Sequence, residues 1–316
     1  IEMKNTNKGW AYRKQLIYGL VLVVLAVVLI PQRNQVIEGV RSLTEASLNW
    51  LLLAGLCFML TYLATAMAYK MLAKKPISLF KVFLVQIAGS FTNRVIPAGL
   101  GGLGLNADFL TKNKHSLVQA GTVVGVNSAV AILNHIALII IAIFMGAVGV
   151  KQILDFKKIP IVGLWIIFFL LLTTIVFVYK STKMRKKIKK ISQNVINNLK
   201  AYKSSPHKIV FVYIIAGVIT LLFVATLYCC AQAVKLEITF IQTFITYTVG
   251  VILGAAVLTP GGLGGVEAGM YGAFLIYNNK PSTVFATIIV YRLLTYWLPI
   301  LPGLLSFILL RRNKQI

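Results

Sequence analysis

The stretches Pro97-Ala-Gly-Leu-Gly-Gly-Leu-Gly104 and Pro260-Gly-Gly-Leu-Gly-Gly-Val-Glu267 decide the fold of this chain. Each follows a long apolar segment, residues 77–96 in the first case and 238–258 in the second. The apolar pieces after them are too short to cross the ~30 Å hydrocarbon core of a bilayer, which takes about 20 helical residues. Because proline ends a helix and glycine adopts turn conformations at little cost, we predict that each stretch is the tip of a re-entrant helical hairpin.

The composition of the whole chain is that of a membrane protein. Of 316 residues, 58% are hydrophobic and only 12% are charged, yet 32 Lys and Arg against 7 Asp and Glu give a net charge of +25. A soluble domain draws about a quarter of its residues from the charged set, and nothing beyond charge favours nucleic-acid binding. The long apolar runs with cations between them predict an all-α polytopic membrane protein.

Charge-free runs divide this single integral membrane domain, residues 1–316, into segments. The basic segment between the two halves places apolar residues at helical spacing among lysines, which predicts an amphipathic helix on the anionic inner leaflet. The expected segments are an anchor helix at 10–32, repeat unit A at 46–150, a linking span at 159–179, the basic amphipathic cytoplasmic loop at 180–208, and repeat unit B at 209–310.

The two units form an internal repeat. Residues 77–83, ISLFKVF, align with residues 238–244, ITFIQTF, and PAGLGG from position 97 aligns with PGGLGG from position 260. With both hairpins re-entrant, 23 of the 32 cations face one side and 7 the other, as the positive-inside rule requires, while Arg94 and Arg292 remain within apolar sequence. The hairpins then enter from opposite sides. We therefore predict an inverted repeat, as in many transporters, with both termini cytoplasmic.

The hairpin tips predict a binding site near the middle of the membrane. Unwound backbone is tolerated there only when it is buried or lines a cavity, and half-helices that begin at the tips would direct N–H groups at an anion such as a phosphate headgroup. The candidate substrate-binding residues are Arg94, Pro97, Gly101, Gly102, Asp108, Pro260, Gly261, Gly262, Gly264, Gly265, Glu267, Tyr291 and Arg292.

The charged candidates each have a second interpretation. Arg292 pairs with Glu267 or a lipid phosphate, or forms a purely structural ion pair. Glu267 pairs with Arg292 or an amino headgroup, or only caps its half-helix. Arg94 is either a second cation of the cavity or a side chain that reaches the interface. Asp108 couples protons or cations, or has no role, and Tyr291 contacts acyl chains or belongs to the interfacial aromatic belt.

Catalytic and cofactor sites are not predicted. Residues 99–104, GLGGLG, match the dinucleotide-binding pattern GxGxxG, but neither a preceding strand nor a βαβ unit accompanies them. Acids clustered for a divalent metal are also missing from the apolar segments. We therefore predict no catalytic residue, no metal and no cofactor.

Two segments of unit B resemble a known family. TPGGLGGVEAG from position 259 and VYRLLTYWLP from position 290 are similar to the flippase-like transmembrane region of the lysylphosphatidylglycerol synthases, the multiple peptide resistance factor family. The resemblance implies a prokaryotic inner-membrane protein that moves a phospholipid or lipid-linked headgroup between leaflets. Unit A departs from the pattern, because GLG at 102–104 replaces the family's Glu and no Arg occurs between 116 and 150.

The sequence thus favours a lipid flippase whose partners are membrane phospholipids, of the phosphatidylglycerol or aminoacyl-phosphatidylglycerol type. No aminoacyl-transferase domain follows in this sequence, so we expect no synthase activity. A secondary transporter of a small solute or ion, a membrane enzyme of lipid metabolism and an assembly factor remain as alternatives. Homo-oligomerisation is left open.

Overall fold

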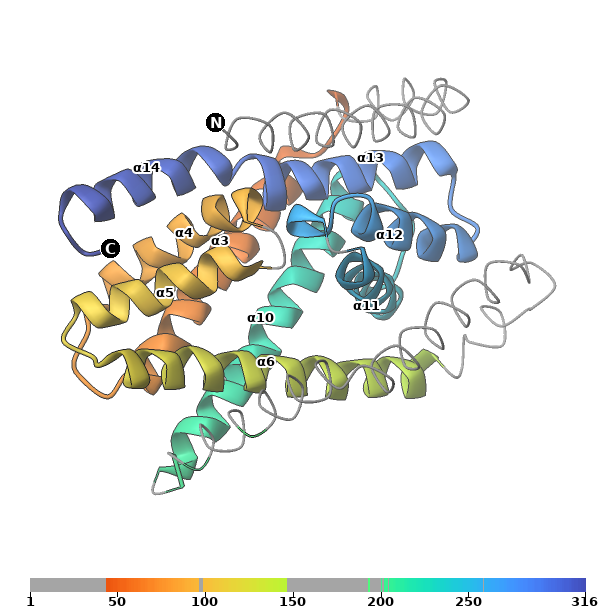
Figure 1. The fold of residues 1–316 in the computed structure, drawn as a ribbon. Coiled ribbons are helices and arrows are strands. Elements are labelled where there is room, and N and C mark those ends of the chain that lie inside the picture. Colours follow the sequence, from red (N-terminus) through yellow and green to blue (C-terminus); the bar gives the residue numbers. More distant parts are fainter. Residues whose placement is uncertain are drawn as a thin grey trace, which may run out of the picture.

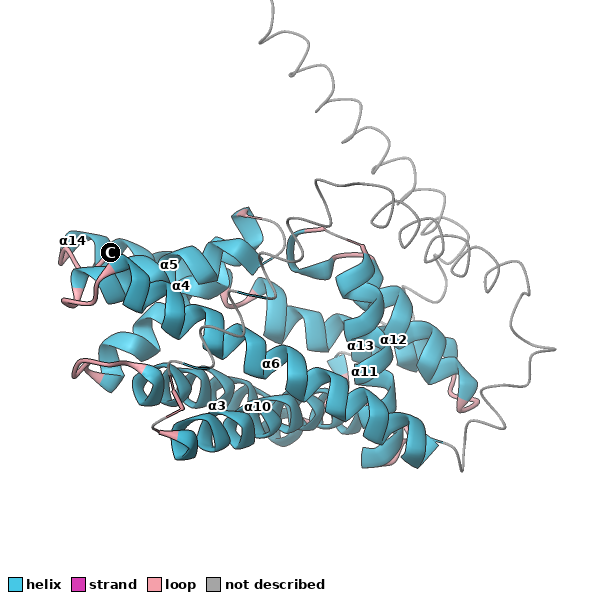
Figure 2. Ribbon diagram, turned by 60° about the horizontal axis from the view of Figure 1, so that its bottom comes forward, coloured by secondary structure: helices cyan, strands magenta, loops and turns pink. Residues whose placement is uncertain are grey.

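The computed structural model describes residues 44–96, 99–146, 193, 200, 202–203, 205–257 and 259–316. All regular elements within these ranges are helices (Figure 2). The predicted anchor helix at 10–32, the linking span at 159–179, most of the loop at 180–208 and Pro97 lie outside the described residues, so the predictions for them stay predictions.

Unit A and unit B contain the same order of described helices: one long helix, a pair of short helices and a final long helical segment (Figure 1). The elements of unit A are α3 (Leu48–Leu72), α4 (Leu79–Val95), α5 (Leu100–Lys112) and α6 (Leu117–Gly146). Those of unit B are α10 (Pro206–Ala233), α11 (Phe240–Ala256), η2 (Pro260–Gly262), α12 (Gly265–Ile276), α13 (Pro281–Arg292), η3 (Leu293–Trp297) and α14 (Ile300–Arg312).

Four helical segments of the described chain are long and apolar enough to cross a membrane: Leu48–Leu72, Leu117–Ile141, Pro206–Ala233 and Pro281–Arg312. Large apolar side chains point outward along them, among them Leu52 at 64% exposure and Leu301 at 70%. A large exposed apolar surface of this kind marks contact with a membrane or with another apolar partner. The prediction of an all-α polytopic membrane protein is confirmed.

The two Pro-Gly stretches each connect a pair of short helices that pack against each other, α4 with α5 and α11 with α12. The second helices have 13 and 12 residues, so α12 is about 18 Å long at 1.5 Å per residue and shorter than the hydrocarbon core. Glycine permits the close packing. A Cβ on Gly101 would lie 2.3 Å from the Thr92 carbonyl oxygen, and one on Gly269 would lie 2.9 Å from the Gly250 Cα.

The units interlock rather than fold as separate bodies. The most extensive helix–helix contact joins α3 to α10, the long first helices of the two units, and α14 of unit B packs along α4 of unit A. Figure 1 shows α10 running at a steep angle across α6, and Figure 2 shows α3 and α10 side by side. Gly303 of α14 fits against α4, because a Cβ there would lie 2.7 Å from Ser90 Oγ.

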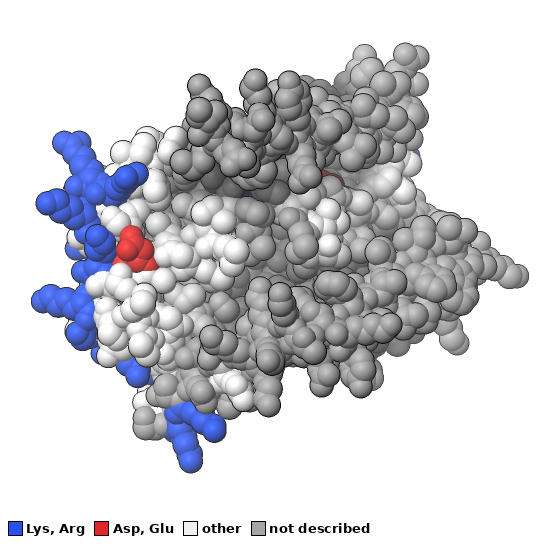
Figure 3. Space-filling model, in the orientation of Figure 1, with Lys and Arg blue, Asp and Glu red and all other residues white. Residues whose placement is uncertain are grey.

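Basic side chains gather at one end of the molecule (Figure 3). At this end α3, α5 and α14 finish and α4, α6 and α10 begin (Figure 1). Its loops are joined by hydrogen bonds: Lys75 N–H donates to His115 Nε2 at 3.1 Å, and the Tyr202 hydroxyl donates to the Leu72 carbonyl at 2.7 Å. Its described basic residues include Lys70, Lys74, Lys75, Lys81, Lys112, Lys114, Lys200, Lys203, Lys208, Arg311, Arg312 and Lys314.

The last apolar segment of unit B is broken close to Pro299. After α13 ends at Arg292, residues Leu293–Trp297 form a π-helical turn, and α14 resumes at Ile300. Pro299 has no N–H, so it cannot donate to the carbonyl of Thr295 four residues earlier. The carbonyls of Thr295 and Tyr296 face unit A, where Arg94 donates a hydrogen bond to each of them.

Candidate functional site

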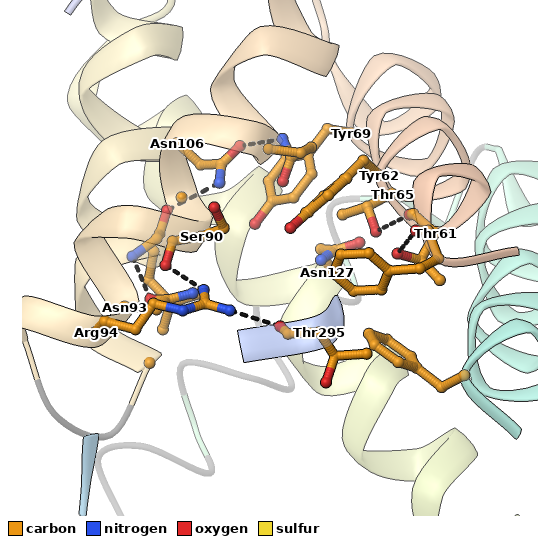
Figure 4. Close-up of a pocket in the computed structure, with 17 residues that line it drawn as sticks. Thr61, Tyr62, Thr65, Tyr69, Ser90, Asn93, Arg94, Asn106, Asn127 and Thr295 are labelled. Atoms are coloured by element: carbon orange, nitrogen blue, oxygen red, sulfur yellow. Dashed lines mark hydrogen bonds between the residues drawn. The ribbon is translucent and has the colours of Figure 1, made fainter. Parts of the chain in front are cut away.

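A polar cavity of about 300 Å³ lies between the α4–α5 hairpin and helix α3 (Figure 4). Unit A supplies most of its wall, and α10 and η3 of unit B complete it. The lining residues are Phe58, Thr61, Tyr62, Thr65, Tyr69, Gln86, Gly89, Ser90, Asn93, Arg94, Gly99, Gly102, Leu103, Asn106, Asn127, Phe223 and Thr295.

Helix α3 presents a hydroxyl-bearing face to the cavity. Thr61, Thr65 and Tyr69 follow one another at intervals of four residues, which places them on one face of the helix, with Tyr62 beside them. The two threonine hydroxyls donate to carbonyls of their own helix, at 2.6 and 2.7 Å. The two tyrosine hydroxyls instead point across the cavity towards α4 and α5 (Figure 4).

The opposite wall is a network of side-chain amides that fastens α5 to α4. Gln86 Nε2 donates to Asn106 Oδ1 at 2.9 Å, and Asn106 Nδ2 donates to the Gly102 carbonyl at 2.8 Å. The Gly102 N–H donates to Asn93 Oδ1 at 2.6 Å, so Asn93 satisfies one of the free N–H groups at the start of α5. The network fixes the orientation of the amides that face the cavity.

Arg94 is the single charged residue among those that line the cavity. Its Nε donates to the Tyr296 carbonyl at 3.0 Å, one Nη donates to the Thr295 carbonyl at 2.7 Å, and the other donates to the Ser90 carbonyl of its own helix. A guanidinium has five N–H groups, so these three bonds leave two. Among the described residues no carboxylate pairs with Arg94, and its positive charge is therefore not neutralised there.

The second arginine lies behind the cavity in a closed ion pair. Arg292 is 8% exposed, and its Nε donates to Glu267 Oε1 at 2.6 Å, while Nη2 donates to the Gly261 carbonyl at 3.2 Å. The other carboxylate oxygen of Glu267 accepts the Gly264 N–H at 2.8 Å. Pairing and capping, the two interpretations of Glu267, therefore both hold.

Tyr296 joins the two arginines. The guanidinium carbons of Arg94 and Arg292 lie 4.9 and 4.8 Å from the centroid of its ring, a distance typical of cation–π contacts. The turn at Gly261 makes room for the ring, because a Cβ at this residue, whose φ is +63°, would lie 2.4 Å from Tyr296 Cε2. The end of α4 and the turn at Gly261 thus meet the π-helical turn at one place.

The structure separates the predicted site residues into two groups. Arg94 and Gly102 line the cavity, and Gly101 packs directly behind it against α4. Asp108 lies on an exposed face of α5 and is not among the lining residues. The unit B candidates with a described position also lie outside the cavity wall: Gly261, Gly262, Gly264, Gly265, Glu267, Tyr291 and Arg292.

Sequence reasoning missed most of the polar wall. Gln86, Ser90 and Asn93 recur at helical spacing in an apolar segment, and so do Thr61, Thr65 and Tyr69 in another. Such uncharged polar residues inside membrane segments tend to face the protein interior. This spacing, rather than formal charge, was the signal for the cavity.

An apolar groove lies beside the polar cavity on the same two helices. It has a volume of about 470 Å³ and is lined by Met59, Leu60, Leu63, Leu79, Phe80 and Phe83. On α3 the groove residues Met59, Leu60 and Leu63 lie in sequence between residues that line the cavity. The two sites therefore occupy neighbouring faces of one helix. The pair of helices α3 and α4 therefore presents a polar site and an apolar site next to each other.

The chain is similar in sequence to a family of membrane proteins. Residues 16–303 match the family model described as the lysylphosphatidylglycerol synthase TM region. The UPF0104 membrane protein MJ1078 of Methanocaldococcus jannaschii is 26% identical over 231 residues, which are 71% of this chain and 95% of that protein. The UPF0104 membrane protein MJ1595 of the same organism is 23% identical over 256 residues, 73% of this chain and 75% of its own.

Proposed function

The chain belongs to the lysylphosphatidylglycerol synthase TM-region family, and from this premise we propose that it is a lipid translocase that moves a phospholipid or lipid-linked headgroup between the leaflets of a prokaryotic cell membrane. The observation that carries the proposal is the polar cavity with one uncompensated arginine beside an apolar groove. A lipid has the same two parts, an anionic headgroup and acyl chains.

In the proposed arrangement, both Pro-Gly hairpins are re-entrant and the two units form an inverted repeat. The concentration of cations at one end of the molecule supports this topology, because cytoplasmic loops carry an excess of Lys and Arg. That end, with the C-terminus, then faces the cytoplasm and its anionic lipids. At the opposite end the described charges are balanced, with Glu45 and Glu237 against Lys235 and Lys280.

Arg94 binds the phosphate of the headgroup in this proposal. An unpaired cation inside a membrane protein is expensive, and such residues commonly mark a substrate pathway. The two unused N–H groups of Arg94 suit two phosphate oxygens, since arginine binds phosphate through paired hydrogen bonds. Because Arg94 also holds the carbonyls of Thr295 and Tyr296, a bound phosphate would compete for the contact that joins unit A to unit B.

The groove between α3 and α4 holds an acyl chain while the headgroup occupies the cavity. Its lining is entirely apolar, and Phe80 is 67% exposed, as suits a surface that faces lipid tails. A transporter of a soluble anion would use the cavity but has no need of this groove. The groove therefore favours the lipid over the small-solute alternative.

A blocking substitution tests the proposed route. In vesicles that contain the purified chain and a fluorescent phosphatidylglycerol, Thr65→Trp fills the cavity from α3 and should reduce lipid transfer to the rate of empty vesicles. Leu52→Trp, on the same helix but 64% exposed, is the matched control and should transfer lipid like the unmodified chain. Equal rates for the two variants would exclude the cavity as the headgroup route.

A further inference from the structure

The π-helical turn Leu293–Trp297 lies where the last helical segment of unit B meets the cavity. We infer that this turn is a hinge, that Arg94 holds it in the position seen here, and that an anion bound at Arg94 releases it. The inference rests on the proposed function, to which it adds a conformational step that depends on the bound substrate.

The backbone of the turn is interrupted at two neighbouring residues. The Leu298 N–H donates to the Leu293 carbonyl five residues earlier, at 2.8 Å, instead of to the carbonyl four residues earlier. Pro299 then removes the donor that the Thr295 carbonyl would have in an unbroken α-helix. Sharp kinks in helices concentrate at such π-helical turns and at prolines. The segment can therefore change direction here more easily than a regular helix.

Unit A supplies donors to the interrupted backbone. Arg94 donates to the Thr295 carbonyl at 2.7 Å and to the Tyr296 carbonyl at 3.0 Å. Ser90, one helical turn earlier on α4, donates through its hydroxyl to the Pro299 carbonyl at 3.0 Å. These three hydrogen bonds form a latch between the units. Bonds from a charged donor are about twice as strong as neutral ones, so Arg94 contributes most of the latch.

An anion in the cavity competes with this latch. Arg94 lines the cavity, so the group that a phosphate would bind is the group that holds the hinge. The guanidinium is a rigid plane, and turning it to align with a phosphate moves all its N–H groups together. A phosphate oxygen is also a stronger acceptor than a carbonyl. The anion therefore binds more tightly when the latch is open, and its binding shifts the hinge towards the released position.

Tyr296 carries the movement of the hinge to the second Pro-Gly stretch. Its ring contacts both Arg94 and Arg292, at 4.9 and 4.8 Å from the guanidinium carbons. The ring also packs against Gly261, whose carbonyl accepts a hydrogen bond from Arg292. The turn at Gly261 should therefore move when Tyr296 moves. Occupation of the cavity in unit A is thereby linked to the hairpin of unit B.

The angle of the hinge can be measured as one distance. Spin labels on Lys280→Cys, just before α13, and on Arg312→Cys, at the end of α14, mark the two ends of the broken segment at exposed positions. The three native cysteines are replaced by alanine. In maltoside detergent we expect one distance without ligand and a second, resolved distance with millimolar dihexanoyl phosphatidylglycerol. Inorganic phosphate is the probe in a parallel titration.

Two proline variants separate the hinge from a general disturbance of the helix. Pro299→Ala restores an N–H that can donate to the Thr295 carbonyl, so the latch weakens and the second distance should appear without ligand. Because linkage is reciprocal, this variant should also bind dihexanoyl phosphatidylglycerol about fivefold or more tightly in a calorimetric titration. Pro302→Ala, at an exposed position of the same segment, is the matched control and should keep the distance and affinity of the unmodified chain.

A second variant opens the latch without removing its charge. In Arg94→Lys the ammonium lacks the planar fork that spans two carbonyls, so the second distance should again appear without ligand. A single distance in the unmodified chain at millimolar probe would overturn the inference. So would an affinity that is unchanged or weaker in folded Pro299→Ala.

The outcomes for the hinge and for translocation are distinguishable. Transfer of labelled phosphatidylglycerol across vesicles, together with a hinge that never leaves its one position, would overturn the inference and leave lipid translocation standing. A second distance with inorganic phosphate, together with no transfer of any lipid, would refute translocation, while the hinge would hold for a soluble anion.

Discussion

Removal of the Glu267 carboxylate should destabilise the protein more than the loss of one surface charge can. In Glu267→Ala, Arg292 keeps its bond to the Gly261 carbonyl but loses its carboxylate partner while remaining 8% exposed. Breaking a buried ion pair from one side costs about 3–5 kcal/mol, since the other charge stays buried and uncompensated. The carboxylate side chain is 30% exposed, so we expect the lower end of this range.

Removal of Arg292, the other member of the ion pair, should cost less stability than removal of Glu267. Arg292→Met leaves Glu267 bound to the Gly264 N–H and within reach of solvent, so the expected loss is about 1–3 kcal/mol. In the double variant no charge is left unpaired at this place. The sum of the stability losses in the two single variants should therefore exceed the stability loss in the double variant by about 2 kcal/mol. A coupling of this size is within the range found for contacting residues.

The assay is the free energy of unfolding in mixed detergent and SDS micelles, followed by the loss of helical circular dichroism. The buried thiols of Cys229 and Cys230 give a second signal, because they react with a thiol-specific dye once α10 loses its packing. Glu237→Ala, at an exposed position, is the control and should change stability by less than about 0.5 kcal/mol. If the stability losses of the two single variants add up to the loss in the double variant, Arg292 and Glu267 do not stabilise each other and the reasoning is refuted.

Three other predictions concern backbone and packing. Gly261→Ala should cost about 1–3 kcal/mol from its φ of +63° and more from the clash with Tyr296, whereas Gly264→Ala, with φ +86° and open space, should show the conformational cost alone; equal losses would contradict the clash. Gly303→Ala should cost about 1–3 kcal/mol by pushing α14 from α4, while Gly272→Ala, with no neighbour within 4 Å, should be neutral or stabilising. Tyr202→Phe should lose about 1 kcal/mol with its bond to the Leu72 carbonyl. Burial raises the pKa of Tyr202 from 10.0 to about 12, so this contribution should be complete below pH 10 and disappear as the pH rises through 12; a difference that vanishes at lower pH would contradict it.

The features predicted correctly from the sequence follow from local chemistry. Proline lacks an N–H and glycine adopts positive φ, so the breaks before Gly99 and around Gly261 could be located without knowledge of the packing. An arginine in an apolar segment needs a partner, and Glu267, beside the second Pro-Gly stretch, was the candidate acid for Arg292.

The position of the cavity was not predictable in the same way. Its wall combines side chains from α3, α4, α5 and α6 with Phe223 of α10 and Thr295 of η3, which only the packing of the two units brings together. The partners of Arg94 are backbone carbonyls, and these have no signature in the sequence. The cavity described above lies on the unit A side, and the prediction of one substrate site around both hairpin tips stays a prediction.

The fate of a fluorescent phosphatidylglycerol in sealed vesicles tests the central claim most directly. Dithionite added outside destroys the label of the outer leaflet at once, and with the chain present the label of the inner leaflet should follow as lipids cross. Arg94→Gln should slow this second phase, and Arg311→Gln, exposed at the end of α14, should not. Loss of the outer-leaflet label alone, as in vesicles without protein, would contradict lipid translocation.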